Sequence, residues 1–210
     1  SCILVDNDQK FYSHNYSIFY EKYLSKFKDK KIDLLEIGSH EGKGLASFFY
    51  FFPKANLLGA NINPFQMHYS SKRIEEIYID VSSKVILKNF KKHIKNNFDV
   101  IIDDASHNLI DILQTLSILF KKVRNGGFYI IEDIDQFEVF PNLNPNKDKL
   151  TPIKILQKIK NNENFETPHL SPKDIDDLKK NIKNIFIEKG YMFLKGKNVS
   201  DIVFIEKNDN

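Results

Sequence analysis

The segment Leu34-Leu35-Glu36-Ile37-Gly38-Ser39-His40-Glu41-Gly42-Lys43-Gly44 decides the fold class of this 210-residue chain. The apolar run Ile32 to Ile37 stops at a glycine and predicts a short β-strand. The glycine cluster predicts a tight turn, and the apolar residues 45–52, which end before Pro53, predict a helix. A strand, a glycine-rich turn and a helix in this order are typical of the start of a βαβ unit.

Strands and helices alternate at short spacing on both sides of this segment. We predict an amphipathic helix over residues 16–28, then strands over 57–60, 77–79, 99–103 and 128–131 and helices over 85–94 and 109–123. We expect Asn125-Gly126-Gly127 to stop the last of these helices. Because strands separated by helices form right-handed crossovers, this alternation predicts a mostly parallel sheet with helices on both faces.

The residues beyond 135 differ in composition and pattern. Residues 137–149 are rich in Asn, Pro and Lys and predict a loop, and helices are expected over 153–159 and 175–182. Residues 185–194 and 201–206 predict two strands joined by a Gly/Asn/Ser turn. We therefore predict one α/β domain over 1–210, with a doubly wound, Rossmann-like, mostly parallel seven-stranded sheet and an antiparallel C-terminal strand. Within it we expect an N-terminal helical cap over 1–30 and a substrate-binding or lid insert over 136–183.

Composition and charge exclude several classes of protein. The hydrophobic share of 41% favours a globular chain, and the single cysteine, Cys2, excludes a disulfide framework. The net charge is +3, and Arg73 and Arg124 are the only arginines, which argues against sequence-specific nucleic-acid binding. No apolar run approaches the about 20 residues of a membrane span, and the opening residues 1–5 are too short for a signal-peptide core. We expect a cytoplasmic protein with no membrane or nucleic-acid partner, and the sequence is compatible with a homo-oligomer.

The glycine-rich turn is a candidate ligand site. Glycine lets the backbone turn sharply and approach a ligand closely, and the following helix offers free N–H groups. The spacing of Gly38, Gly42 and Gly44 matches neither the dinucleotide fingerprint nor a phosphate-binding loop. Glu36, just before the first glycine, suits a ligand that carries an ammonium group. The alternative is that the glycines serve only the packing of a tight turn between strand and helix.

Acidic residues follow two further predicted strands. Asp103-Asp104-Ala105-Ser106-His107 follows the fourth strand, and Glu132-Asp133 follows the fifth. The carboxyl ends of parallel strands meet at one edge of a sheet, so these carboxylates would converge and repel one another unless a cation lies between them. Oxygen ligands favour Mg²⁺, Ca²⁺ or Mn²⁺. The alternative is that Asp104 or Ser106 caps the following helix and that Asp133 is a plain loop residue.

His107 is the general-base candidate among the six histidines. An imidazole ordinarily titrates at about pH 6.5 and so accepts a hydroxyl proton near neutral pH. The alternative is a surface or helix-capping histidine. The other histidines have no comparable setting, and we expect structural or exposed positions for His14, His40, His68, His93 and His169.

The glycine turn resembles that of the class I S-adenosylmethionine-dependent methyltransferases. In that family the acid and the glycines hold the methionine part of the cofactor. The resemblance implies that the cofactor-binding residues are Glu36, Gly38, Ser39, Gly42, Gly44, Asn61, Asp80, Asp103 and Tyr16. Asn61 stands where the family has an acid that binds the ribose hydroxyls, and Asp80 stands where the family contacts the adenine. We predict that Asn61→Asp tightens cofactor binding by about 1 kcal/mol, because an ionised acceptor binds a hydroxyl more strongly.

The acidic clusters resemble those of the metal-dependent sugar O-methyltransferases of macrolide biosynthesis and of the related cephalosporin-hydroxylase-like group. The N-terminal Lys10-Phe11-Tyr12-Ser13-His14-Asn15-Tyr16 also resembles a segment that closes over the cofactor in that family. The resemblance spans about residues 10–135 and returns at 201–207. It implies that Asp104, Glu132 and Asp133 bind Mg²⁺ or Mn²⁺. It also implies that His107 is the catalytic base, with Asp104 beside it.

These features together predict a methyltransferase that transfers a methyl group from S-adenosylmethionine to a hydroxyl of a sugar in polysaccharide or natural-product biosynthesis. We expect the small-molecule acceptor to be a sugar nucleotide. Two alternatives stay open: a different reaction on the same fold, either N-methylation of another small molecule or a non-methyl reaction, and a non-catalytic scaffold protein with a methyltransferase fold. Binding of S-adenosylmethionine would separate the scaffold from the enzymes, because the scaffold predicts no binding.

Overall fold

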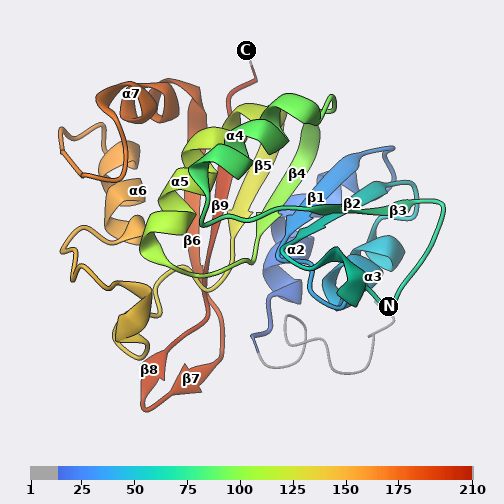
Figure 1. Cartoon of the computed structure of the whole chain (residues 1–210), viewed down its shortest axis with the longest axis horizontal. Helices are drawn as coiled ribbons and strands as arrows, with labels where there is room; N and C mark the ends of the chain where they lie inside the picture. Colours follow the sequence, from blue (N-terminus) through green and yellow to red (C-terminus); the bar gives the residue numbers. More distant parts are fainter. Residues whose placement is uncertain (1–13, 210) are drawn as a thin grey trace.

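The protein is described by a computed structural model that covers residues 14–209. A seven-stranded sheet forms its centre, with helices on both faces and a two-stranded hairpin at the lower end of the view (Figure 1). Residues 1–13 and 210 lie outside the described range, and with them Cys2 and residues 10–13 of the segment that ends at Tyr16.

The elements follow the predicted order. The strands of the large sheet are β1 (Asp33–Ile37), β2 (Asn56–Asn61), β3 (Ile74–Tyr78), β4 (Phe98–Asp103), β5 (Val123–Ile131), β6 (Ile182–Lys189) and β9 (Asp201–Lys207), and the hairpin is β7 (Phe193–Leu194) with β8 (Lys197–Asn198). The α-helices are α2 (Ser17–Leu24), α3 (Lys43–Phe51), α4 (Lys84–His93), α5 (Leu109–Leu119), α6 (Pro152–Lys160) and α7 (Pro172–Asn181). None of the described helices combines the length and apolar character that crossing a membrane would need.

The strand order in the sheet is β3-β2-β1-β4-β5-β9-β6. Strands β1 to β5 pair in parallel, and β9 pairs antiparallel with both β5 and β6. The order reverses between β1 and β4, which is the switch point where open α/β sheets bind ligands beyond the carboxyl ends of their strands. The predicted doubly wound seven-stranded sheet with an antiparallel C-terminal strand is confirmed.

Alternating side chains of the strands supply two apolar cores. Leu34 of β1 and Phe128 of β5 pack with α2 and α3, whereas their neighbours Leu35 and Tyr129 pack with α4, α5, α6 and α7. Because successive residues of a strand face opposite sides, a strand buried on both faces is a continuous apolar run. This explains why β4 and β5 were recognisable as short apolar runs.

The segment 136–183, expected as a substrate-binding or lid insert, contains two helices that belong to a core of the fold. Helix α6 buries Ile155 and Leu156, and α7 buries Ile175 and Leu178, in the same apolar cluster as α5. The stretch before α6 carries a 3-10 turn, η4 (Pro141–Leu143). A role of the segment 136–183 in substrate binding stays a prediction.

The structure differs from the prediction at Asn125-Gly126-Gly127, which were expected to stop a helix. Helix α5 ends at Leu119, a 3-10 turn follows, and these residues lie inside β5. The register between β4 and β5 shifts there, and a Cβ at Gly127 would lie 2.5 Å from the carbonyl oxygen of Asp99. Gly127 thus allows the two strands to approach each other closely.

The helix predicted over 16–28 also differs, because it consists of α2 followed by a 3-10 turn, η1 (Ser25–Phe27).

Candidate active site

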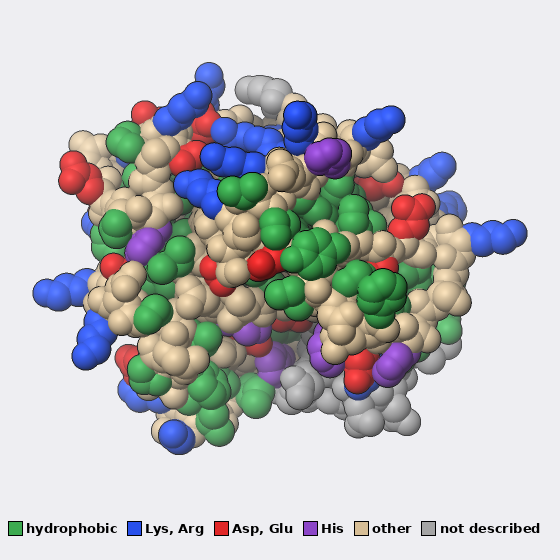
Figure 2. Space-filling model, in the orientation of Figure 1, with side chains coloured by type: hydrophobic (Ala, Val, Ile, Leu, Met, Phe, Trp, Pro, Cys, Tyr) green, Lys and Arg blue, Asp and Glu red, His purple; other side chains and the backbone are tan. Residues whose placement is uncertain are grey.

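A cavity of about 750 Å³ lies where the carboxyl ends of β1, β4 and β5 meet. Small-molecule sites typically measure about 300–1,000 Å³. The predicted site residues that line it are Glu36, Gly38, Ser39, Gly44, Asn61, Asp80, Asp104, His107, Glu132 and Asp133. Figure 2 shows several histidine side chains gathered near the lower part of this face of the molecule.

Lysines at the ends of α4 and α5 form a basic surface away from this cavity, which among residues 14–209 is itself lined by one lysine, Lys43. Helices α4 and α5 run back along the sheet after leaving its carboxyl edge, so their last turns lie at the opposite edge. Lys91 and Lys92 end α4, and Lys121 and Lys122 follow α5, where basic side chains also suit the helix dipole. In Figure 2 Lys and Arg side chains gather at the upper edge, away from the histidines in the lower part of this face.

The glycines of the turn after β1 are required by contacts within the chain. Gly38 has a φ of +87°, and a Cβ there would lie 2.1 Å from the carbonyl oxygen of Asp104. At Gly44 a Cβ would meet Glu36 Oε1 at 2.2 Å. Gly42, the N-cap of α3, has a φ of +83° and does not line the cavity. Packing therefore accounts for these glycines, and cofactor contact stays a prediction for all three.

The residues expected at the ribose and the adenine already make hydrogen bonds within their own turns. Asn61 Oδ1 accepts from the Ile62 N–H at 2.9 Å, and its Nδ2 donates to the Asn63 carbonyl at 3.2 Å. Asp80 Oδ1 accepts from both the backbone N–H and the hydroxyl of Ser82, at 2.9 and 2.6 Å. Both side chains line the cavity and shape the loops after β2 and β3.

Ser39 presents a polar atom to the cavity. Its Oγ is buried and has no hydrogen-bond partner among residues 14–209. Buried polar atoms in folded proteins are ordinarily hydrogen-bonded. A polar ligand atom at this place would satisfy it.

Asp103 and Tyr16, both expected to bind the cofactor, do not line the cavity. Asp103 is buried and accepts a hydrogen bond from the Tyr129 phenol at 2.8 Å. Burial raises the pKa of Asp103 to about 7, against the opposing effects of that hydrogen bond and of His107. Tyr16 donates to Asp133 Oδ1 at 2.5 Å, and burial, together with the negative charge of Asp133, raises the pKa of its phenol. Both residues lie behind the cavity wall, and their contact with a cofactor stays a prediction.

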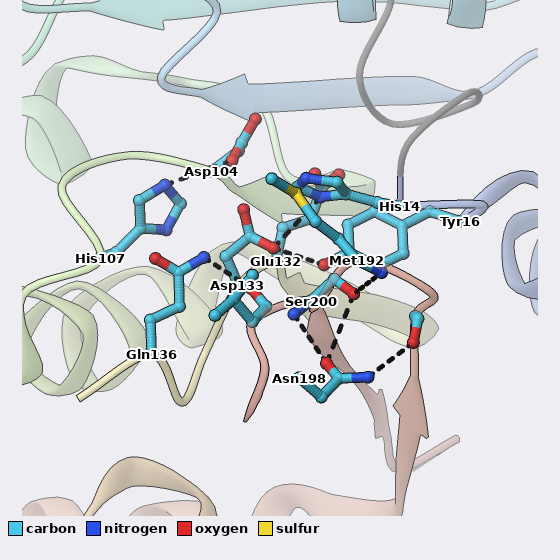
Figure 3. Close-up of polar contacts among 12 residues, drawn as sticks. His14, Tyr16, Asp104, His107, Glu132, Asp133, Gln136, Met192, Asn198 and Ser200 are labelled. Atoms are coloured by element: carbon cyan, nitrogen blue, oxygen red, sulfur yellow. Dashed lines mark hydrogen bonds and ion pairs between the residues drawn. The ribbon is translucent and has the colours of Figure 1, made fainter. Parts of the chain in front are cut away.

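Asp104, His107 and Asp133 form the acid–histidine cluster of the cavity (Figure 3). Each contributes one potential ligand atom, and these three atoms lie within 4.8 Å of one another. His107 Nε2 is 3.7 Å from Asp104 Oδ1. His107 and Asp133 have φ values of 54° and 53°, in the left-handed region that residues other than glycine rarely adopt. Such strain is concentrated at functional sites in proteins.

Glu132, the third predicted cation ligand, lies outside this cluster although it lines the cavity. Its buried side chain accepts a hydrogen bond from the Tyr20 phenol, and its backbone N–H donates to the Asp103 carbonyl at 3.0 Å. The structure thus brings together Asp104 and Asp133 of the three predicted ligands and adds His107 to them.

The helix-capping alternative does not describe Asp104 or Ser106. Asn108 is the N-cap of α5, and its Oδ1 accepts from the Ile110 N–H at 3.0 Å. Ser106 Oγ donates instead to Asp111 Oδ2 at 2.6 Å. Asp111 also lines the cavity, burial raises the pKa of its carboxyl, and the sequence pattern gave no reason to select it.

His14 lines the cavity, although a structural or exposed position was expected for it. Its Nδ1 lies 3.3 Å from Asp133 Oδ1 (Figure 3). Its backbone carbonyl accepts from the Tyr191 N–H at 3.1 Å, which ties it to the residues just before the β7–β8 hairpin. The available signal was its place two residues before Tyr16, within the segment that carries the resemblance.

Curated proteins similar to this chain are sugar O-methyltransferases, although no protein-family model matches it. The 8-demethyl-8-alpha-L-rhamnosyl tetracenomycin-C 2'-O-methyltransferase of Streptomyces olivaceus is 27% identical over 128 residues, which are 58% of this chain and 33% of that protein. The mycinamicin VI 2''-O-methyltransferase of Micromonospora griseorubida is 29% identical over 128 residues, which are 58% of this chain and 32% of that protein. The similarity thus covers about a third of the length of these relatives.

Solved methyltransferases share the fold over nearly the whole chain. The MycE methyltransferase of the mycinamycin biosynthetic pathway, solved in complex with Mg, SAH and mycinamycin VI, matches 94% of this chain and 50% of its own at a TM-score of 0.69 and 22% identity. The plantazolicin methyltransferase BpumL matches 92% of this chain and 82% of its own in one complex with SAH, at a TM-score of 0.61 and 16% identity. This chain therefore has the class I methyltransferase fold, and its sequence is similar to those of sugar O-methyltransferases of tetracenomycin and macrolide biosynthesis.

Proposed function

We propose that this chain forms the cofactor-binding and catalytic part of an S-adenosylmethionine-dependent O-methyltransferase that acts on a hydroxyl of a sugar or sugar nucleotide. The observation that carries the proposal is a cavity with the glycine turn on one wall and the Asp104–His107–Asp133 cluster on another. The similarity to named sugar O-methyltransferases supports the same chemistry.

In this proposal S-adenosylmethionine lies along the turn after β1. Glu36 binds the ammonium group of the cofactor, and the buried Ser39 hydroxyl gains the hydrogen-bond partner that residues 14–209 do not give it. Asn61 at the end of β2 and Asp80 in the loop after β3 border the ribose and the adenine. When bound, the cofactor supplies an electrophilic methyl group on a sulfonium centre.

Asp104 and Asp133, together with Glu132, are the residues that would hold Mg²⁺ or Mn²⁺. Carboxylate oxygens are the ligands that these hard cations prefer, and the close approach of Asp104 to Asp133 fits such a site. When bound, the cation would lower the pKa of the acceptor hydroxyl.

His107 is the proposed base. Its imidazole borders the cavity with a quarter of the side chain exposed, and the nearby Asp104 carboxylate orients the ring. As the C–O bond to the acceptor forms and the S–C bond breaks, the hydroxyl proton passes to His107. Much of the rate is expected from holding the two substrates in line.

Transfer of a labelled methyl group from S-adenosylmethionine to a panel of sugar nucleotides and rhamnosylated compounds tests the proposal. We expect transfer that a chelator abolishes and added Mg²⁺ or Mn²⁺ restores. Asp104→Asn should lose activity, whereas Asp177→Asn, which removes a surface partner of Lys121 away from the cavity, should not.

Three results would contradict parts of the proposal. Absence of S-adenosylmethionine binding in calorimetry would support the scaffold alternative. Transfer to amines but not to hydroxyls would support N-methylation. Full activity in excess chelator would exclude the cation while leaving the methyl transfer intact.

A further inference from the structure

Two tyrosines at the start of α2 donate hydrogen bonds to two consecutive acids of the cavity. Tyr16, the N-cap of α2, donates to Asp133 Oδ1 at 2.5 Å, and Tyr20 donates to Glu132 Oε1. The two tyrosines are four residues apart, so they lie on one face of the helix. Each hydroxyl therefore reaches a different carboxylate of the same pair.

The two acids need this support because of where the strand ends. Glu132 and Asp133 follow β5 directly, and successive side chains of a strand would face opposite sides of the sheet. The left-handed backbone at Asp133 breaks this alternation, and both acids line the cavity. Adjacent buried carboxylates repel each other, and a hydrogen bond from a fixed donor stabilises each of them.

The tyrosine rings are themselves fixed by packing. Tyr16 and Tyr20 are 0% and 1% exposed. The Tyr20 ring stands edge-on to Phe48 and Phe204, with centroid distances of 5.1 and 5.8 Å. The Tyr16 ring stands edge-on to His14 at 5.1 Å. Because the rings cannot move freely, the positions of their hydroxyl groups, and of the oxygens that accept from them, are set by the docking of α2.

We propose that Tyr16 and Tyr20 are positioning residues that hold Glu132 and Asp133 in the geometry required for binding a divalent cation. This inference rests on the proposed function, which assigns the two acids to the cation. Each tyrosine hydroxyl occupies one carboxylate oxygen and fixes the rotation of the carboxylate. The helix before β1 thereby takes part in a site formed by loops more than a hundred residues later in the chain.

Tyrosine-to-phenylalanine variants test this inference with little change in packing. Partners in the second layer of a metal site typically change metal affinity by about 10–100-fold when removed. We expect Tyr16→Phe and Tyr20→Phe each to weaken Mn²⁺ binding by about tenfold or more, measured from the electron paramagnetic resonance signal of free Mn²⁺. Affinity for S-adenosylmethionine, measured by calorimetry, should stay within about twofold in Tyr20→Phe, because Tyr20 is not among the residues expected to bind the cofactor.

Tyr23→Phe is the matched control. Tyr23 lies on the same helix, and its hydroxyl donates to Glu188, which does not line the cavity. Its removal should leave Mn²⁺ affinity unchanged. Circular dichroism establishes that each variant is folded, and if Tyr20→Phe does not fold, Tyr16→Phe carries the test alone.

The outcomes separate this inference from the function on which it rests. If the parent binds Mn²⁺ and the folded Tyr16→Phe and Tyr20→Phe variants bind it equally well, the inference is wrong and the cation assignment stands. If the parent binds no Mn²⁺, both the cation assignment and the inference are wrong. Binding of S-adenosylmethionine and methyl transfer would still test the rest of the proposed function independently.

Discussion

The two walls of the cavity are built by different physical means. On the wall after β1, shape is set by backbone packing, since Gly38 lies against the carbonyl of Asp104 and leaves no room for a Cβ. On the wall after β4 and β5, shape is set by side-chain hydrogen bonds and by left-handed backbone at His107 and Asp133. The glycine pattern after β1 therefore reports first on packing, whereas the acids and the histidine after β4 and β5 indicate chemistry.

This difference predicts that substitutions on the two walls fail in different ways. Changes at Gly38 should act through stability, because they disturb the contact between the turns that follow β1 and β4. Changes after β4 and β5 should act through turnover while the fold persists.

His107→Ala should give the largest loss of activity among changes after β4 and β5. Removal of a general base typically costs about 10²–10⁴ in rate. Cofactor affinity should be unchanged, because His107 is assigned to the acceptor. The measurements are turnover with labelled cofactor and a calorimetric titration of the same variant. A variant that retains the parental rate would exclude His107 as the base without touching the cation assignment.

Gly38→Ala should give the largest loss of stability among changes in the turn after β1. A Cβ at 2.1 Å from the Asp104 carbonyl oxygen, on a backbone with positive φ, should lower the free energy of unfolding by about 3 kcal/mol or more. Gly196→Ala is the matched control, because Gly196 also has a positive φ but no atom within 4 Å of an added Cβ. Equal losses in chemical denaturation of the two variants would show that the close approach does not matter.

The raised pKa of Asp103, at the end of β4, predicts that the stability of the protein depends on pH. This pKa is raised from 3.8 to about 7 by burial, so the folded state keeps a proton that the unfolded state has already released above pH 4. The stabilisation from this group is present below pH 4 and is lost as pH rises through 7. One pKa unit corresponds to about 1.4 kcal/mol, so the parent should lose about 3 kcal/mol relative to Asp103→Asn between pH 5 and 8. Parallel unfolding curves of the two proteins across this range would contradict the raised pKa.

Asn61→Asp should have the smallest effect, and its sign distinguishes two predictions. The sequence pattern predicts tighter cofactor binding, because an acid would bind the ribose more strongly. The structure adds a cost, because the Asn61 amide donates to the Asn63 carbonyl and a carboxylate cannot donate there. We expect the free energy of unfolding to fall by about 1 kcal/mol with no gain in cofactor affinity. Tighter binding with unchanged stability would favour the direct ribose contact.

Most of the fold could be predicted because its signals are local. Runs such as residues 100–102 are apolar throughout, which marks strands buried on both faces, and Pro53 ends the apolar run of α3 just beyond the helix. The error at Asn125-Gly126-Gly127 arose because glycines in a strand bulge and glycines in a turn look the same in sequence. The role of Gly127 depends on the approach of Asp99 from a neighbouring strand, which no local pattern records.

The acids of the candidate site could be predicted from the sequence, but the residues that hydrogen-bond to them or lie against them could not. Asp104 and Asp133 stand at strand ends, and the parallel sheet brings strand ends together. Tyr16, Tyr20 and His14 reach the same site from a helix and a segment more than a hundred residues earlier in the chain. Their aromatic character is equally suited to a core, so only the three-dimensional arrangement separates the buried hydroxyl donors from ordinary packing residues.

The position of β9 has a consequence for the synthesis of the protein. It is the last strand in chain order, yet it lies between β5 and β6 and pairs with both. Until residues 201–207 leave the ribosome, β5 and β6 each present an unpaired edge, and Asp133 lacks the neighbouring contact of Ile134 with the Asp201 carbonyl. Nascent chains should therefore depend on chaperones that shield strand edges until residues 201–207 are available for pairing.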